Sequence, residues 1–325
     1  MVALLLYSKI NSNTDVKSYS FIAIFCTFKT YLHLVKIVPV LHIEQFEEEH
    51  SSVDFYSNAL AAHLKKNETI VHRPHKHDFF LCVLFLKGRG VHEIDFSSYP
   101  IEKGSLFFLK PGQTHSWKFD SAVEGYIFFH TQSFFELNIS GVKLHQFPFY
   151  YSYKNPPNLT LSPEALQDIA VRFNEINQEY HANAVYKRQK LASLINLAYI
   201  DLSRYYAAFD TTQNVLSPTY LKILSELEQT VEQYYRSEKQ ARFYADKLHI
   251  TTKHLNRVTK STLGKTTTEL INDRILLEAK RLIVHSQTSL AHVAEFLGYE
   301  DYAYFSRVFK AKTQSTPLEF KKRYQ

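Results

Sequence analysis

Apolar residues in the last third of the chain recur at helical spacing. Leu290, Val293, Ala294 and Leu297 occupy positions i, i+3, i+4 and i+7, which predicts a helix with one buried face. Gly298 follows, where the end of a helix often needs a left-handed residue. The next helix is predicted to have its cap at Asp301 and its buried positions at Tyr304 or Phe305, Val308 and Phe309.

The same pattern occurs about fifty residues earlier. Residues 255–260 align with residues 305–310 at an offset of fifty, and residues 245–248 align with residues 294–297 at an offset of forty-nine. A repeat of this length with one inserted residue predicts a duplicated helix–turn–helix unit. Two ordinary hairpins of a helical bundle are the weaker interpretation, because both copies are in register. The first copy is predicted from Phe243 or Tyr244, Ala245 and Leu248, a turn at His249–Thr251, a cap at Thr251 or Thr252, and the buried Leu255 and Val258.

The outward face of the second helix in each copy indicates a partner. In the first copy, Lys253, Asn256, Arg257 and Lys260 lie opposite the apolar stripe. Arginine can form two hydrogen bonds with guanine and asparagine can do so with adenine, so this face suits the major groove of DNA. A charged helix face is more often simply solvated, and that alternative stands for either helix considered alone. The matching positions in the second copy are Tyr302, Ala303, Ser306, Arg307 and Lys310.

The distribution of charge favours nucleic acid over a merely solvated face. Residues 251–325 contain 13 Lys and Arg but 7 Asp and Glu, a net charge of +6, which equals the net charge of the whole 325-residue chain. Residues 1–214 are neutral, with 20 charges of each sign. All the excess positive charge therefore lies in the segment that carries the repeat, as expected for a protein that binds DNA phosphates.

With these motifs, the C-terminal hundred residues resemble the DNA-binding domain of the AraC/XylS family of bacterial transcription regulators. The resemblance rests on residues 297–301, 304–310 and 316–324 and on a connecting helix at 274–282. It implies that two recognition helices enter successive major grooves of double-stranded DNA. The first copy departs from the family at Thr259, where an aromatic residue is usual, and at His249, so its packing is expected to be looser. The implied base readers are Lys253, Asn256, Arg257, Tyr302, Ser306 and Arg307, and the implied phosphate contacts are Lys260 and Lys310. Ala303 or the ring of Tyr302 could contact a thymine methyl group.

The remainder of the chain is long enough for a second domain with its own core. Cys26 and Cys82 are far apart and lack CxxC spacing, so we expect no disulfide framework and a reducing, cytoplasmic location. Residues 1–34 contain an apolar run that is too short to span a bilayer. We expect this segment to be a dispensable extension, disordered or the product of a mis-assigned start, and we expect no contact with a membrane.

Residues 35–150 show the pattern of short β-strands. Apolar runs at 81–86, 106–109 and 123–130 are separated by Gly and Pro, which favours a small β-barrel or sandwich. Lys87–Gly90 is predicted to form a hairpin turn after the first of these runs. Residues 91–96 alternate between inward and outward positions, and Tyr99–Pro100 is predicted to form the next turn.

Two histidine motifs flank these strands and resemble those of cupin barrels. They place His75, His77 and His115 at the histidine positions of metal-binding cupins, but the usual carboxylate is absent, with Glu93 or Asp78 as poor substitutes. Three imidazoles could hold zinc or iron, could line an effector pocket, or could be structural. We expect an effector pocket formed by His75, His77, His115 and Trp117, with no metal and no cofactor.

Residues 151–210 contain two helical patterns. Ser162–Pro163 marks a helix start, followed by apolar residues at helical spacing up to Ile176, and a second helix is expected from about Val185 to Tyr206. These helices could merely cover the barrel, but the family resemblance implies that they form a dimer interface. Residues 211–218 are expected to be a linker, and residues 219–325 the DNA-binding domain.

The sequence thus predicts an α+β multidomain protein, with a cupin-like sensor, a helical pair and an all-α domain in which a long helix joins two helix–turn–helix motifs. We expect a transcription regulator that responds to a small-molecule effector and works as a homodimer with RNA polymerase. The family resemblance implies an activator rather than a repressor. No catalytic constellation stands out, so we expect no enzyme activity. The alternative is a metal-dependent cupin enzyme, a dioxygenase or isomerase, with an accessory DNA-binding domain.

Overall fold

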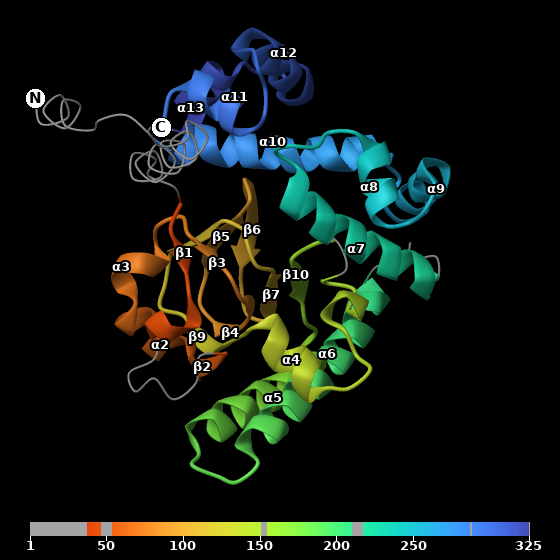
Figure 1. The fold of residues 1–325 in the computed structure, drawn as a ribbon. Coiled ribbons are helices and arrows are strands. Elements are labelled where there is room, and N and C mark those ends of the chain that lie inside the picture. The colour runs from red at the N-terminus through yellow and green to blue at the C-terminus, as the bar shows by residue number, and fades with distance from the viewer. Residues whose placement is uncertain (1–37, 47–53, 151–154, 210–216, 287, 325) are drawn as a thin grey trace, which may run out of the picture.

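The computed structural model describes residues 38–46, 54–150, 155–209, 217–286 and 288–324. The N-terminal extension at 1–34 and almost all of the linker at 211–218 lie outside these residues. Figure 1 shows a β-rich domain, a pair of long helices beside it and a helical domain at the opposite end, so the expected fold class is confirmed.

Two antiparallel sheets form the β-rich domain. The larger has the strand order β10-β7-β4-β9-β2, and the smaller has the order β6-β5-β8. A short parallel pair, β1 and β3, precedes them. The strands are β1 (Val40–Leu41), β2 (Phe55–Ala59), β3 (Lys76–His77), β4 (Phe80–Lys87), β5 (Gly90–Ile94), β6 (Ser97–Ile101), β7 (Ser105–Leu109), β8 (His115–Phe119), β9 (Glu124–His130) and β10 (Asn158–Thr160).

Strand β4 is apolar along nearly its whole length because both faces of the larger sheet are covered. Alternate residues such as Leu81 and Val83 face the barrel interior, where Ile94 and Trp117 of the smaller sheet meet them. The intervening residues, such as Cys82 and Leu84, join the core beneath the helical pair. A strand buried on both faces reads as a continuous apolar run, which explains the pattern at 81–86.

The prediction of a hairpin at Lys87–Gly90 is wrong. β4 pairs with β7 and β9, whereas β5 pairs with β6 and β8, so these residues carry the chain from one sheet to the other. Gly88 has φ +104°, and a Cβ on Gly90 would lie 2.3 Å from the carbonyl oxygen of Lys118. The glycines thus permit a sharp turn and a close approach between strands. A chain that passes from one sheet to another requires both features, and so does a hairpin.

The predicted turn at Tyr99–Pro100 is also wrong. Both residues lie within β6, an edge strand of the smaller sheet, where a proline is tolerated. The hairpin between β5 and β6 turns instead at Asp95 and Phe96, whose φ angles are +48° and +70°. Two successive left-handed residues are typical of a type I′ turn, which usually employs Asn and Gly.

Helices α5 (Pro163–His181) and α6 (Lys187–Phe209) pack together on the outer face of the larger sheet. Ser162 caps α5 and Pro163 opens it, as predicted. The apolar stripes of both helices are buried, so covering the barrel is one established role of the pair. The shorter helical elements of this half are η1 (Ile43–Phe46), α2 (Leu60–Lys66), α3 (Glu68–Val71), α4 (Gln132–Asn138) and η2 (Leu144–Gln146).

The C-terminal domain has one core, built from all of its helices. α10 runs through its middle and joins the two halves of the repeat (Figure 1). None of the helices among the described residues is long and apolar enough to cross a membrane. The helices are α7 (Pro218–Tyr234), α8 (Ala241–Lys247), α9 (Thr252–Leu263), α10 (Thr267–His285), α11 (Leu290–Phe296), α12 (Tyr302–Thr313) and α13 (Pro317–Tyr324).

Candidate functional site

The duplicated unit appears in the structure as two equivalent helix pairs, α8 with α9 and α11 with α12. The side chain of Thr251 accepts a hydrogen bond from the backbone N–H of His254, and Asp301 accepts from the N–H groups of Ala303 and Tyr304. Both predicted caps are therefore confirmed. The turns before these caps contain His249 at φ +54° and Gly298 at φ +73°. The first copy therefore places a histidine in the left-handed conformation, which glycine adopts more readily.

The repeat extends into the helices that follow. Thr266 and Glu269 form a capping box at the start of α10, and Thr316 and Glu319 form the same pair of bonds at the start of α13. These bonds close the first turn of the helix that follows α9 in the first copy and α12 in the second. The same four-residue motif thus follows the second helix of both copies.

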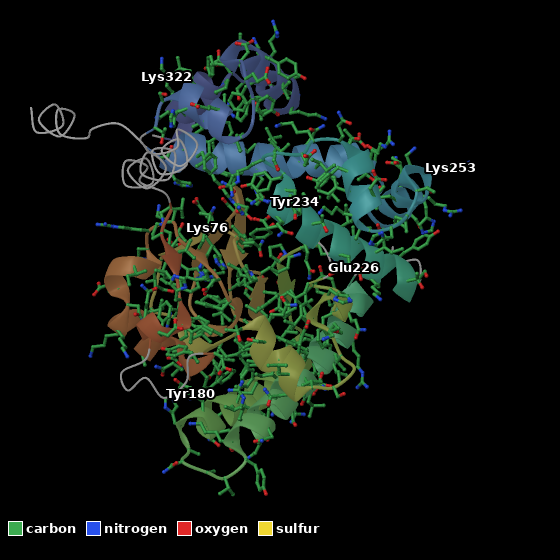
Figure 2. The ribbon with its side chains drawn as sticks, viewed as in Figure 1. Lys76, Tyr180, Glu226, Tyr234, Lys253 and Lys322 are labelled. Atoms are coloured by element: carbon green, nitrogen blue, oxygen red, sulfur yellow. The ribbon has the colours of Figure 1, made fainter. Side chains whose placement is uncertain are left out.

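The residues expected to contact DNA lie on the outer faces of α9 and α12. Lys253, at the outer edge of α9, is far from the β-rich domain (Figure 2). Asn256 and Ser306 are half-buried beside the apolar stripes, and the other members are exposed. The exposed members are Lys253, Arg257, Lys260, Tyr302, Ala303, Arg307 and Lys310.

Asn256 has a structural contact that the sequence did not indicate. Its Oδ1 atom accepts a hydrogen bond of 3.0 Å from the backbone N–H of Thr267, the first residue of α10. A bidentate contact with adenine needs both the oxygen and the nitrogen of the amide, so it would require this bond to break. Arg257, in contrast, is exposed, and its Nη2 atom lies 2.7 Å from Nδ1 of His254 on the same helix.

Thr259 is fully buried where the second copy has Phe309. Its hydroxyl donates to the carbonyl of Asn256 at 3.2 Å and lies 3.4 Å from the hydroxyl of Thr267. A buried hydroxyl with a partner carries little penalty. At this position the first copy thus has, in place of an aromatic ring, a hydroxyl that bonds within α9 and also meets Thr267 of α10.

In the β-rich domain, the three predicted histidines converge. His75, His77 and His115 are each at most 2% exposed, and their potential ligand nitrogens all lie within 4.8 Å of one another. The Nε2 atoms of His77 and His115 are 2.9 Å apart. Trp117, on the same strand as His115, is buried next to it with ring centroids 5.1 Å apart.

A fourth histidine, His92, belongs to this cluster and was missed. Its Nε2 atom lies 2.8 Å from Nδ1 of His115. The alternation of residues 91–96 places His92 on the opposite face from Val91 and Glu93, and the structure buries it, but alternation does not reveal which side chain it meets. Burial lowers the pKa of His77, His92 and His115 well below the usual imidazole value, and the nearby His75 adds to this shift in each of them. The imidazoles are therefore neutral at physiological pH.

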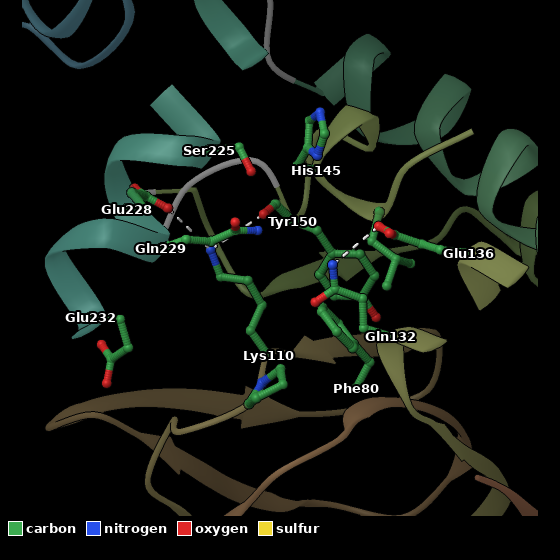
Figure 3. A pocket seen from close by; sticks show the side chains of 12 residues that line it. Phe80, Lys110, Gln132, Glu136, His145, Tyr150, Ser225, Glu228, Gln229 and Glu232 are labelled. Carbon is green, nitrogen blue, oxygen red and sulfur yellow. Dashed lines mark hydrogen bonds and ion pairs between the residues drawn. The ribbon is translucent and has the colours of Figure 1, made fainter. Parts of the chain in front are cut away.

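The four residues expected to line an effector pocket leave little room for an organic molecule. Their side chains are buried in mutual contact, and neither of the two cavities described for this structure has them in its walls. A cavity of about 300 Å³ lies elsewhere, between the β-rich domain and α7 (Figure 3). Its walls include Phe80, Lys110 and Tyr150 on one side and Ser225, Glu228 and Gln229 of α7 on the other.

Lys110 reaches across this cavity. Its Nζ atom lies 3.3 Å from the carbonyl oxygen of Tyr150 and 3.7 Å from a carboxylate oxygen of Glu228 on α7 (Figure 3). Burial lowers the pKa of Lys110, and the nearby Glu228 opposes that shift. The sequence could not indicate this cavity, because its walls are brought together only when the two domains meet.

The two domains also meet through a buried ionic network between the barrel and α10. Arg281 binds Asp95, at the tip of the β5–β6 hairpin, and its Nη1 donates to Glu278 at 3.2 Å. Lys76 of β3, at the end of the barrel near α10 (Figure 2), lies 3.4 Å from the same carboxylate group, and Arg274 donates to it at 3.1 Å. Burial alone would raise the pKa of Glu278, but these three cations together lower it to about 2.

Two family models match this chain, one in each domain. An AraC-like ligand-binding domain matches residues 58–184, and a helix-turn-helix domain matches residues 244–323. Among curated proteins, the transcriptional activator RhaR of Enterobacter sp. (strain 638) is 22% identical over 276 residues, covering 83% of this chain and 95% of RhaR. The uncharacterized regulator YfiF of Bacillus subtilis (strain 168) is 22% identical over 298 residues, covering 90% of this chain and 91% of YfiF.

Among solved structures, fatty-acid-bound ToxT of Vibrio cholerae covers 84% of this chain and 96% of its own, with 16% identity and a TM-score of 0.41. The curated relatives above are described as transcription regulators, so the alternative of a cupin enzyme gains no support. The matched models agree with the β-rich sensor and the helical DNA-binding domain expected from the sequence.

Proposed function

Because this chain belongs to the AraC/XylS family of DNA-binding transcription regulators, we propose that α9 and α12 read its operator in two successive major grooves. The observation that carries this proposal is the pair of equivalent, capped recognition helices, each with an exposed basic outer face. α10 packs against α8, α9, α11 and α13, so it holds the two helices in one fixed relation. Two short DNA boxes about one helical turn apart suit such an arrangement.

The outer residues divide into two roles by chemistry and position. Arg257 and Arg307 occupy matching positions of the repeat and read bases, because a guanidinium can donate two hydrogen bonds to guanine. Tyr302, Ala303 and Ser306 of α12 and Lys253 of α9 supplement them. Lys260 and Lys310, one turn further along, contact phosphates. Asn256 reads a base only if its bond to the N–H of Thr267 yields, so its part in recognition is the least supported.

Selection of bound genomic fragments by the purified full-length protein tests this function. The expected result is an asymmetric site with two short conserved boxes about one helical turn, roughly 10 base pairs, apart. Binding without any sequence preference would contradict it. The Arg257→Ala and Arg307→Ala variants should each change the selected bases in one box only, which assigns each helix to its box.

The regulator responds to a small-molecule effector that binds in the cavity between the β-rich domain and α7. A ligand shifts a conformational equilibrium only through contacts that differ between the two states. A molecule in this cavity would touch both domains and would stabilise their present arrangement. The test is a screen of metabolites for those that raise the melting temperature. The rise should disappear in Glu228→Gln and Lys110→Met but persist in the surface variant Glu124→Gln.

The protein works in the cytoplasm as a homodimer that activates transcription by contacting RNA polymerase. The support for a dimer is an outward face of α5 and α6 on which Val171, Leu197 and Ile200 are 56%, 40% and 37% exposed. Light scattering of the purified protein checks this. Leu197→Glu combined with Ile200→Glu should produce monomers, while Lys253→Glu, an exposed substitution on α9 of the other domain, should not.

A further inference from the structure

The histidine cluster has the features of a metal site, although its missing carboxylate had argued against one. Its three potential ligands are imidazoles from two neighbouring segments: His75 and His77 at the start of β3, and His115 at the start of β8. The backbones of His75 and His115 are hydrogen-bonded to each other. The backbone carbonyl of Arg73 lies 2.8 Å from Nδ1 of His75. A carbonyl can only accept, so Nδ1 carries the proton and Nε2 keeps its lone pair. Metal-binding histidines usually donate their other ring N–H in this way, to a carboxylate, a backbone carbonyl or water.

His77 and its neighbour His92 are less satisfied by the protein itself. Within the described part of the chain, Nδ1 of His77 and Nδ1 of His92 are buried without any hydrogen-bond partner. The Nε2 atoms of His77 and His115 face each other at 2.9 Å, so only one of them can hold a proton. Around a tetrahedral ion with bonds of about 2.0–2.1 Å, such nitrogens lie about 3.3 Å apart. A small separation of two side chains would therefore admit the ion.

We propose that His75, His77 and His115 bind a divalent first-row transition metal ion, and that the ion acts on the DNA-binding domain through Lys76 and Asp95. Three imidazoles suit zinc and its neighbours, whereas calcium and magnesium require oxygen ligands that the cluster does not contain. Three protein ligands leave one position for water or a small ligand. His92 orients His115 from behind, through the bond between its Nε2 and Nδ1 of His115.

The path to the DNA-binding domain is short. Lys76 lies between His75 and His77 in the chain, and its ammonium group is 3.4 Å from Glu278 on α10. Asp95 accepts a hydrogen bond of 3.0 Å from the backbone N–H of Thr114, the residue before His115, and binds Arg281 on α10. Lys76, which contacts Glu278, is thus adjacent in sequence to two proposed ligands. Asp95, which contacts Arg281, is hydrogen-bonded to the residue before the third ligand.

α10 is also the helix that spaces α9 and α12. A shift of the ligand strands by a few tenths of an ångström would alter the bonds to Glu278 and Arg281, and with them how firmly the barrel holds α10. Metal binding would thereby change the affinity for the operator. This second half of the proposal rests on the proposed function as a DNA-binding regulator, whereas metal binding itself does not.

Titration of the metal-stripped full-length protein tests the site. Zinc affinity is measured by competition with a chromophoric chelator. Cobalt binding is followed by visible absorption, and the spectrum of the unaltered protein itself reports whether the ion occupies a low-symmetry nitrogen site. We expect one ion per chain. His77→Gln and His115→Gln should lose the ion, and His92→Gln should weaken binding by about 10–100-fold. His72→Gln, which changes an exposed histidine three residues before His75, should bind as the unaltered protein does.

Operator binding with and without zinc tests the coupling. The unaltered protein should change its affinity by a factor of about 5–150, and Lys76→Met and Asp95→Asn should bind zinc normally yet lose this response. Lys103→Met, an exposed lysine of the same domain, serves as the matched control. Absence of stoichiometric binding, or undiminished binding in both His variants, would overturn the site, and zinc binding without a change in operator affinity would overturn the coupling. If no operator is selected at all, the proposed function fails while the zinc titration still decides the site.

Discussion

Arg281 of α10 and Asp95 of the β5–β6 hairpin lie 186 positions apart and form a buried ion pair, with Nε and Nη2 of the arginine both donating to Oδ1 of the aspartate. Arg281 is 3% exposed. Next to this pair, the ring of Phe96 stacks on His285 and meets Phe320 and Tyr324 edge-on. One two-residue turn of the sensor thus makes both an ionic and an aromatic contact with the DNA-binding domain.

Removal of Arg281 should therefore destabilise the protein strongly. Arg281→Met leaves the carboxylates of Asp95 and Glu278 buried with one cation fewer, at a cost of about 3–5 kcal/mol in the free energy of unfolding. Urea unfolding followed by circular dichroism measures it. The control is Arg204→Met. The side chain of Arg204 is 77% exposed and pairs with Asp201, so this substitution should change the free energy of unfolding by at most about 1 kcal/mol. Equal effects of the two substitutions would show that the buried network contributes little.

The network should also make stability fall in acid. The pKa of Glu278 is about 2 in the folded protein, below the usual carboxyl value of 4.5. A group whose pKa is depressed by folding contributes stability that is complete above the unfolded pKa and is lost as the pH falls towards the folded pKa. Between about pH 5 and pH 2 the free energy of unfolding should therefore decline. Glu278→Gln should flatten this part of the profile, whereas Glu124→Gln, at an exposed ion pair, should leave its slope unchanged.

Substitutions on α9 should separate base reading from phosphate contact. Arg257→Ala should cost about 1–3 kcal/mol on the selected operator and relax the preference at one base position. Lys260→Ala should instead weaken binding to all sequences alike and reduce the salt dependence by about one ion. Fluorescence anisotropy at several salt concentrations, on the operator and on single-base variants, distinguishes these outcomes. A uniform loss on every sequence for Arg257→Ala would exclude it as a base reader.

Two glycines of the repeat provide a matched test of close packing. Gly264 and Gly298 have nearly the same left-handed φ angles, +67° and +73°. A Cβ on Gly264 meets nothing within 4 Å, so Gly264→Ala should cost only the conformational penalty, about 1–2 kcal/mol. A Cβ on Gly298 would lie 2.1 Å from the carbonyl oxygen of Arg236, so Gly298→Ala must displace the backbone and should cost more. Thermal unfolding of both variants measures the two losses of stability. Equal losses would mean that the backbone at Arg236 moves aside at little cost.

The candidate site could be predicted only in part. The caps at Thr251 and Asp301 were predictable because a cap joins a side chain to an N–H group two or three residues away. His75, His77 and His115 were grouped by resemblance, and the structure brings them together. His92 was not, because strand alternation gives the face of a side chain but not its neighbour. The strands joined by Lys87–Gly90 were wrongly paired for the same reason, since a glycine-rich turn does not specify which sheet the chain enters next.

The sequence by itself determined the duplicated helix–turn–helix unit, its charged outer faces and the apolar runs of the barrel. These features depend on residues a few positions apart, whose spacing decides which helix or strand face is buried. Only the tertiary structure decided that Asp95 meets Arg281, that Lys76 meets Glu278 and that a cavity lies between Lys110 and α7. Those contacts arise from the docking of two separately folded cores, and the partner of a buried charge across such an interface is set by three-dimensional proximity, which local spacing does not encode.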